Sequence, residues 1–268
     1  YGLTSGQIRE VMEESGALHE GFFGYHGGSF HDSKVEGNYT WKTERDGSLG
    51  QGFTQEGVEG SHEIISPVLY GKQGQLHCER VWRNLMKAGF KVDRKCGTHI
   101  TIGVNHNARF NRMSDAKKHT VGMRIAQVYS HFQPVFDALS SNVRNSNSQG
   151  YCRAVNFGNV FNARTSAVNL TKWALYGIVE FRQFGYTTDI KNFRGWMQLL
   201  DSLVNGATNE NHKSFNKNLN DFPVTIQGMS DFLNCGAKAT RWMDSRISEM
   251  MRYQQGRTNR IEVMGGEQ

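Results

Sequence analysis

The 268-residue sequence contains only 3 prolines and 4 cysteines. Because proline is scarce and glycine is frequent, at 30 residues, we expect many tight turns rather than proline-rich linkers. The cysteines are widely spaced and form no Cys-x-x-Cys pair, which argues against a zinc knuckle or a thioredoxin-type site. A disulfide framework is uncommon in a chain of this length, so the sequence predicts a reducing, cytoplasmic compartment. The four cysteines are Cys78, Cys96, Cys152 and Cys235.

Long apolar runs are also missing. No run approaches 18 residues, so the sequence predicts no membrane span and no membrane partner. The chain begins Tyr1-Gly-Leu-Thr, which has none of the features of a signal peptide. Because this start lacks methionine, we expect the true N-terminus to lie upstream of Tyr1.

The composition is that of a globular protein with a basic excess. Hydrophobic residues make up 37% of the chain, which is enough for a substantial core. The net charge of +6 favours an anionic partner, whether a nucleotide, a nucleic acid or an acidic peptide. The basic residues are spread along the chain without an aromatic-basic motif, so the sequence argues against a nucleic-acid binder.

Helices and strands alternate along the chain. Apolar residues at helical spacing predict helices over residues 4–15, 74–88, 115–140, 189–204 and 239–254. Alternation with a period of two predicts strands over residues 38–45, 63–66, 98–104 and 167–170 and within 177–189. This order predicts an α+β fold, in which an antiparallel sheet carries helices on one face and a polar trough on the other.

Several finer features accompany this prediction. Pro134 is expected to kink the helix of residues 115–140 or to split it in two, and Thr188 to cap the helix of residues 189–204. We expect the histidine-rich stretch of residues 19–31 to be a mobile loop rather than a metal site, because its spacing fits no standard site. Residues 205–222 are expected to be a surface loop, and the tail after Gly256 to be loose.

The stretch of residues 177–189 places two opposite charges in an otherwise apolar strand. Alternation points Val179, Phe181 and Gln183 to one face, and Ile178, Glu180, Arg182 and Phe184 to the other. A carboxylate and a guanidinium two residues apart can hold a metal–phosphate group, or they can form a half-buried ion pair that supports the sheet. The sequence leaves both interpretations open.

Three further residues are candidate site residues, and two of them, Glu63 and His99, share the predicted trough with Glu180 and Arg182. Glu63 lies in a strand that is apolar on both faces, so its carboxylate needs a partner or a metal ion. His99 lies on the polar face of its strand, either as a surface histidine or as a site residue. Asp46 begins the turn Asp46-Gly47-Ser48, where it either forms the turn or contacts a metal or an amine.

Several short motifs follow one another within about residues 38–204. They are Trp41 to Ser48, Glu63-Ile-Ile-Ser-Pro-Val-Leu, Gly97-Thr-His-Ile-Thr-Ile, Tyr151-Cys152-Arg153, Arg164-x-x-Ala-Val-Asn-Leu, and Gly177-Ile-Val-Glu-Phe-Arg-Gln-Phe with Thr187 and Asp189. In their order and spacing, these motifs resemble the amidoligase family of the glutamine synthetase and glutamate–cysteine ligase superfamily.

The resemblance implies a ligase that uses ATP and Mg²⁺ to join a small-molecule or peptide carboxylate to an amine through an acyl phosphate. It further implies a curved antiparallel sheet whose strands carry the site. By the same resemblance, the metal ligands would be Glu63, His99 and Glu180; the ATP contacts would be Arg164, Arg182 and Asn169; and the catalytic residues would be Glu180, Arg182 and Asp46.

The sequence departs from the family pattern at two places. Family members usually begin with a Gly-x-Glu-x-Glu strand, which nothing before residue 38 matches, so we expect this strand to lie upstream of Tyr1 or to be lacking. Thr165 stands where the family tends to have an aromatic residue after the arginine.

The alternative to a ligase is a ligase-fold protein without activity that serves as a structural or assembly component. We expect residues 1–204 to form the catalytic domain, and residues 205–268 to form a loop and helical extension packed on it. The sequence leaves open whether the chain forms a homo-oligomer or binds an assembly partner.

Overall fold

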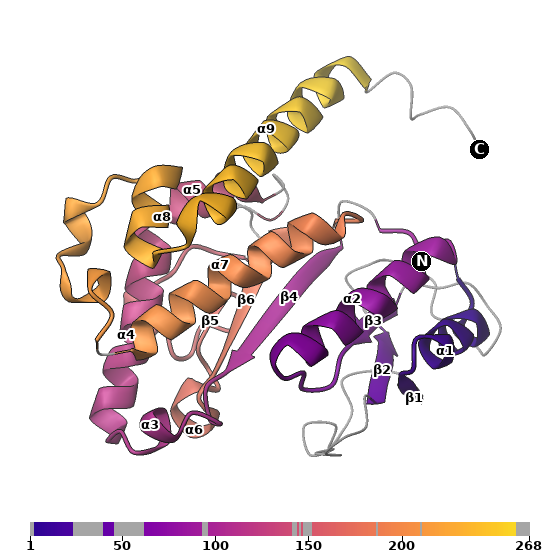
Figure 1. Ribbon diagram of the computed structural model, residues 1–268, viewed down its shortest axis with the longest axis horizontal. Helices are drawn as coiled ribbons and strands as arrows, with labels where there is room; N and C mark the ends of the chain where they lie inside the picture. The colour runs from indigo at the N-terminus through magenta and orange to yellow at the C-terminus, as the bar shows by residue number, and fades with distance from the viewer. Residues whose placement is uncertain are drawn as a thin grey trace. The chain divides into compact units, whose positions relative to one another are not determined.

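The computed structural model describes residues 3–23, 40–45, 62–92, 96–140, 144, 146, 152–185, 187–209 and 211–260. The chain divides into two compact units, Tyr1–Cys96 and Gly97–Gln268 (Figure 1). Both units combine helices with a three-stranded sheet, which agrees with the α+β class that the sequence predicts. The sheet curvature, the polar trough and the domain assignment around residue 204 stay predictions.

In the described residues of unit 1, two helices and three strands surround a small core. The strands pair in the order β1-β2-β3, with β1 parallel to β2 and β2 antiparallel to β3. The elements are α1 (Ser5–Glu14), β1 (Leu18–Phe23), β2 (Thr40–Arg45), β3 (His62–Ile65) and α2 (Gly71–Lys87).

The local sequence explains where the helices of unit 1 begin and end. Thr4 and Gln7 form a capping box at the start of α1, because each side chain bonds the other residue's backbone N–H. Gly16, at φ 71°, allows the chain to leave the helix in a left-handed conformation. The apolar faces of α1 and α2 then pack with Trp41 of β2, whose indole N–H donates to His77 Nε2 at 2.9 Å.

Two predictions for unit 1 are wrong. The first residues of the expected mobile loop form β1, while the rest of the stretch up to His31 lies outside the described residues. The expectation of an antiparallel sheet fails for β1 and β2, which run parallel. A parallel pair needs a long crossover connection, and residues 24–39 are long enough to supply it.

Unit 2 contains the second sheet and most of the helices. Its strands pair antiparallel in the order β4-β6-β5, so the predicted hairpin between residues 167–170 and the strand of Glu180 is confirmed. The elements are β4 (Gly97–Gly103), α3 (Ala108–Asn111), α4 (Asp115–His131), α5 (Gln133–Leu139), η3 (Phe157–Asn159), β5 (Val168–Asn169), α6 (Trp173–Tyr176), β6 (Ile178–Gly185), α7 (Ile190–Thr208), η4 (Ser214–Asn216), η5 (Leu219–Asp221), α8 (Ile226–Leu233) and α9 (Gly236–Arg260).

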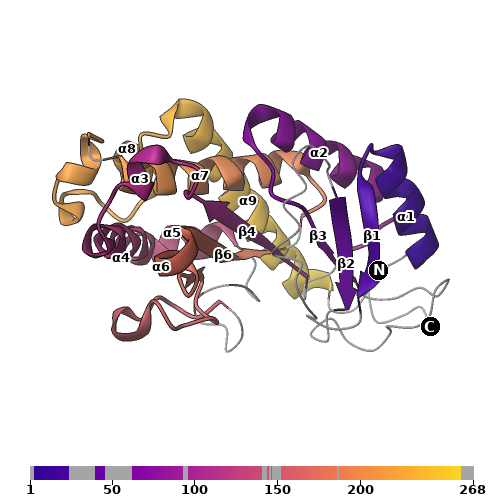
Figure 2. The same ribbon diagram turned by 90° about the horizontal axis from the view of Figure 1, so that it is seen from below.

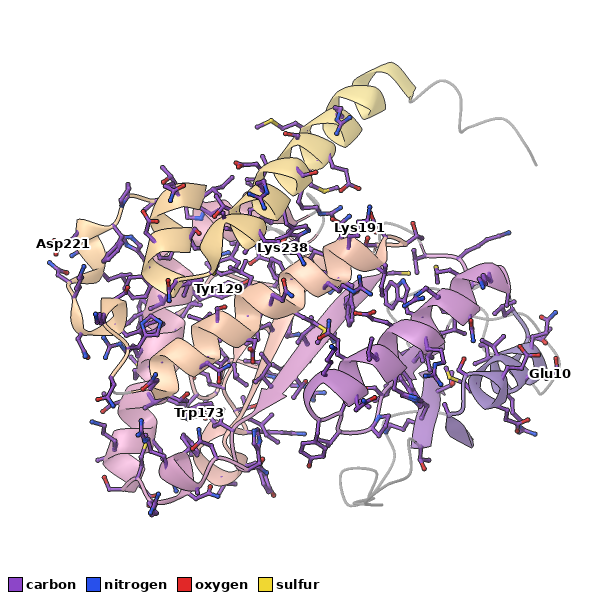
Figure 3. All side chains as sticks on the ribbon, viewed as in Figure 1. Glu10, Tyr129, Trp173, Lys191, Asp221 and Lys238 are labelled. Carbon is purple, nitrogen blue, oxygen red and sulfur yellow. The ribbon has the colours of Figure 1, made fainter. Side chains whose placement is uncertain are left out.

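An aromatic core joins the sheet of unit 2 to its helices. Figure 2 shows α7 running along one side of β4 and β6. Tyr129 of α4, labelled in Figure 3, is fully buried and stacks on Phe136 of α5, with ring centroids 3.9 Å apart. Phe136 in turn meets the edge of Trp196 of α7 at 5.6 Å. These rings fix three helices to one another and cover one face of the sheet.

Several predicted boundaries in unit 2 change. The expected break at Pro134 is confirmed, because this proline lies in the first turn of α5. The cap of α7 is Asp189 rather than Thr188, since the Asp189 side chain accepts from the N–H of Lys191 at 2.8 Å. The predicted surface loop contains Phe215, which is only 1% exposed.

The C-terminal helices also differ from the prediction. Helix α8 is not predicted from the sequence, and α9 extends through Arg260, beyond the predicted end at residue 254. In Figure 1 the end of α9 projects past α7 and α8. Among the described residues, no helix combines the length and the apolar character that crossing a membrane requires.

Candidate functional site

The strand β6 contains a β-bulge at the centre of the candidate site. Phe181 lies opposite Ile100 of β4, whereas Phe184 lies opposite Thr98. Two residues of β6, Arg182 and Gln183, therefore face the single residue His99. A bulge of this kind bends its strand and re-aims the side chains around it.

The bulge corrects one prediction about the strand faces. Phe184 is expected to share a face with Glu180 and Arg182, but it is fully buried on the helix side. Its ring stacks on Trp196 of α7, with centroids 4.8 Å apart and an interplanar angle of 15°. The extra residue shifts the alternation after Gln183, so Gln183 and Phe184 both face inward and Phe184 joins Phe181 in the aromatic core.

The charged residues at the bulge and next to it lie together on the other face. Arg182 Nη1 donates to Glu180 Oε1 at 2.7 Å, and His99 Nδ1 lies 3.4 Å from the same oxygen. Asn169 Nδ2 donates to the second oxygen, Oε2, at 2.7 Å. The carboxylate of Glu180 is thus contacted from all three strands of the sheet.

Partial burial strengthens these interactions. The exposed fraction of the side chain is 22% for Glu180, 13% for Arg182 and 26% for His99. Burial alone would raise the pKa of Glu180, but Arg182, His99 and the Asn169 hydrogen bond together lower the pKa below its usual value. Glu180 is therefore ionised at neutral pH, while part of the cluster remains accessible to a ligand.

The inward face of the bulge is fixed by a buried polar network around Gln183. Its Oε1 accepts from the Tyr129 hydroxyl at 2.7 Å and from Gln133 Nε2 at 2.9 Å, and its Nε2 donates to Asp137. Asp137 also accepts from the backbone N–H of Ser146 at 2.8 Å and from its hydroxyl at 2.6 Å. This network connects the strand that carries Arg182 to α4, α5 and Ser146.

A second guanidinium, which no sequence motif predicts, lies near the cluster. Arg144 lies so close to Gly97 of β4 that any side chain at Gly97 would overlap its guanidinium. Gly97 and His99 are two residues apart on a strand and therefore share a face. Arg144 Nη1 is 3.9 Å from Cys152 Sγ, and this thiol donates to the carbonyl of Arg182 at 3.1 Å.

The remaining predicted site residues lie in other elements or outside the described residues. Arg164 is exposed, in the turns between η3 and β5. Glu63 belongs to β3 of unit 1, where it pairs in register with Glu44 of β2. Asp46 lies outside the described residues. Of the predicted set, the structure therefore brings together His99, Asn169, Glu180 and Arg182.

The cluster can supply one protein ligand to Mg²⁺, the Glu180 carboxylate, but not a complete coordination shell. Within the described part of the chain, no group of three or more His, Cys, Asp or Glu residues could hold a metal ion. Protein sites often bind Mg²⁺ through one or two carboxylates and complete its shell with phosphate oxygens and water. Among the described residues, Glu180 Oε2 accepts a hydrogen bond only from Asn169. A carboxylate oxygen has two acceptor positions, so the second position of Oε2 remains for an ion.

Comparison with known proteins gives one match. A family model described as "Putative amidoligase enzyme" matches residues 7–157, which is more than half of the chain. The match includes Glu63 and His99 but ends before β5 and β6. No curated protein and no solved structure matches the chain. The placement of Glu180 and Arg182 in the site therefore depends on the geometry of the sheet.

Proposed function

Because this chain belongs to the amidoligase family, we propose that it is a ligase that uses ATP to join a carboxylate to an amine. The observation that carries this proposal is the contact of Glu180 with Arg182, His99 and Asn169 on one face of the sheet. A partly exposed cluster of ionised and polar groups on a rigid sheet is the kind of site that phosphoryl transfer needs.

The chemistry takes place in two steps. The γ-phosphoryl group of ATP moves to an oxygen of the substrate carboxylate, which gives an acyl phosphate and ADP. The amine then attacks the acyl carbon, the bond to the phosphate oxygen breaks, and an amide and inorganic phosphate form. The protein contributes orientation and charge stabilisation, because this reaction requires little covalent help from side chains.

The predicted site residues have roles that suit this reaction. Arg182 would bind phosphate oxygens through its planar guanidinium, and the Glu180 contact fixes the plane of this group. Arg164 and Asn169 would contribute further nucleotide contacts. Asp46 would orient the incoming amine or take its proton.

Glu180 would also hold the divalent ion. Its carboxylate, beside His99, would bind Mg²⁺, which when bound neutralises charge on the phosphate oxygens. Removal of Mg²⁺ by a chelator should therefore abolish turnover of the full chain, and the result should be reversed when excess Mg²⁺ is added.

The decisive experiment compares two neutralised carboxylates. The full chain is incubated with ATP, Mg²⁺ and pools of carboxylates and amines, and ADP release is followed. Glu180→Gln should lower turnover by about 100- to 1,000-fold while the protein stays folded. Asp221→Asn is the matched control, because Asp221 is exposed in η5. Undiminished ADP release by Glu180→Gln would reject the proposed mechanism.

A second candidate is a ligase-fold protein without activity that acts as an assembly component. The observation that favours it is the engagement of both Glu180 oxygens by protein groups, which is also the arrangement of a structural ion pair. Calorimetric titration of the full chain with ATP and Mg²⁺ separates the two candidates. Absence of binding heat would favour this candidate, whereas saturable binding would favour the ligase.

A further inference from the structure

The hairpin of β5 and β6 ends in a short chain of hydrogen bonds that leads from the protein surface to Glu180. Asn169, the last residue of β5, lies directly opposite Glu180 in the strand register. Its amide nitrogen donates to Glu180 Oε2 at 2.7 Å. Asn169 is 8% exposed, so its amide group needs a partner for each of its polar ends.

Thr171 fixes the other end of this amide. The backbone N–H of Thr171 donates to Asn169 Oδ1 at 3.0 Å, and the Thr171 hydroxyl donates to the same oxygen at 2.7 Å. Turning the amide over would place its NH₂ group against these two donors and its oxygen against the Glu180 carboxylate. Both contacts would be repulsive, so Thr171 determines that Asn169 presents a donor to Glu180.

The orientation of Glu180 in turn determines the orientation of its neighbours. With Oε2 held by Asn169, Oε1 is directed at Arg182 Nη1 and His99 Nδ1. A carboxylate that lost the Asn169 bond could rotate about its last torsion, which is broad and roughly two-fold. Arg182 would then lose the fixed partner that sets the plane of its guanidinium.

We infer that Thr171 and Asn169 are positioning residues, which hold Glu180 so that Arg182 and His99 present a preformed surface to the phosphate groups of the nucleotide. The effect of these residues on catalysis rests on the proposed ligase function. Their effect on the orientation of Glu180 rests on the hydrogen bonds alone. Thr171 itself is exposed and touches the reaction only through Asn169.

The test compares Thr171→Val with Thr171→Ser in the full chain. Valine has nearly the same shape as threonine but removes the hydroxyl donor, while the backbone donor remains. Serine keeps both donors and should restore the arrangement. Thr120→Val is a matched control, because Thr120 is also exposed and its hydroxyl bonds only within its own helix, to the Ala116 carbonyl at 2.9 Å.

The first measurement is independent of activity. In a ¹⁵N-labelled sample, the two side-chain amide protons of Asn169 should be well separated, because one of them bonds a carboxylate. Thr171→Val should reduce this separation and shift the ¹³C signal of the Glu180 carboxyl group, whereas Thr171→Ser and Thr120→Val should leave both signals near their wild-type positions. Unchanged Asn169 and Glu180 signals in Thr171→Val would overturn the inference.

The second measurement uses turnover. Thr171→Val should lower kcat by about tenfold and leave KM for ATP within about twofold, since positioning acts mainly on the reacting complex. Thr171→Ser should remain within about twofold of the wild type. A normal kcat with altered Asn169 signals would overturn the catalytic role. If the wild-type chain shows no turnover at all, the ligase proposal fails, and the amide signals alone decide the geometric part.

Discussion

Gln183 is a fully buried polar residue at the β-bulge, and its replacement by methionine should destabilise the protein strongly. Methionine has a similar length and volume, so the change leaves no large cavity. It removes the acceptor for the Tyr129 hydroxyl and for Gln133 Nε2, and it removes the donor to Asp137. Asp137 still accepts hydrogen bonds from Gln133 and Ser146. The buried Tyr129 hydroxyl, in contrast, loses its acceptor, Gln183 Oε1.

The expected cost follows from this list of bonds. Each hydrogen bond contributes a net free energy of about 1 kcal/mol, and a buried hydroxyl without a partner costs about 1–3 kcal/mol. Gln183→Met should therefore lower the free energy of unfolding by about 3 kcal/mol. This is a large share of the roughly 5–15 kcal/mol that holds a typical domain together. Tyr129→Phe alone should cost only about 1 kcal/mol, because Gln183 Oε1 keeps its bond from Gln133.

The assay is urea unfolding followed by tryptophan fluorescence, applied to both single variants and to the double variant. In the Tyr129→Phe background, Gln183→Met no longer leaves a buried hydroxyl without a partner. The loss of unfolding free energy caused by Gln183→Met should therefore be smaller by about 1–2 kcal/mol. Trp173, Trp196 and Trp242 all lie in unit 2 and report on the region of the bulge. If the loss of unfolding free energy in the double variant equals the sum of the two single losses within about 0.3 kcal/mol, the network as described is refuted.

Three further predictions concern other parts of the molecule. Gly195→Val should destabilise the protein by at least about 2 kcal/mol in thermal unfolding, because a side chain there would overlap the ring of Trp242. Burial raises the pKa of Cys78 to about 12 and that of Cys235 to about 11. Both thiols should therefore react slowly with iodoacetamide at pH 8 in the folded chain and rapidly in urea. Peptide mass spectrometry measures the extent of labelling, and rapid labelling of the native protein would contradict this prediction. Because the folded-state pKa of Glu180 lies below the usual 4.5, its ion pair should stabilise the protein above that pH and lose its effect as the pH falls through the lowered pKa. The difference in unfolding free energy between the wild type and Glu180→Gln should accordingly shrink on acidification, and a pH-independent difference would count against the ion pair.

The parts of the site that depend on local sequence could be predicted. A period-two pattern places Glu180 and Arg182 on one face of their strand, and the structure confirms this face. The proximity of Asn169 follows from the hairpin, because two strands with a short connection pair antiparallel. The break at Pro134 was also predictable, since a proline inside a helical pattern removes a backbone donor.

The parts that depend on tertiary contacts could not be predicted in the same way. A bulge has no fixed sequence signature, so the direction of Phe184 was predicted from regular alternation and was wrong. One signal was present, because Gln183 is a polar residue on the inward face of an apolar strand and therefore needs buried partners. Those partners, Tyr129 and Asp137, are about 50 residues away along the chain, and only the folded structure identifies them.

The bulge links the buried network to the candidate site. An extra residue in a strand interrupts the ladder of backbone hydrogen bonds, which is unfavourable unless other contacts offset it. Gln183 supplies this offset through its side chain, and its backbone neighbour Arg182 still donates to the Ala167 carbonyl at 3.0 Å. Disruption of the network should therefore change the position of Arg182 as well as the stability of unit 2. We expect Gln183→Met to raise KM for ATP at temperatures where the chain is still folded, whereas an unchanged KM would show that the inward network is structural only.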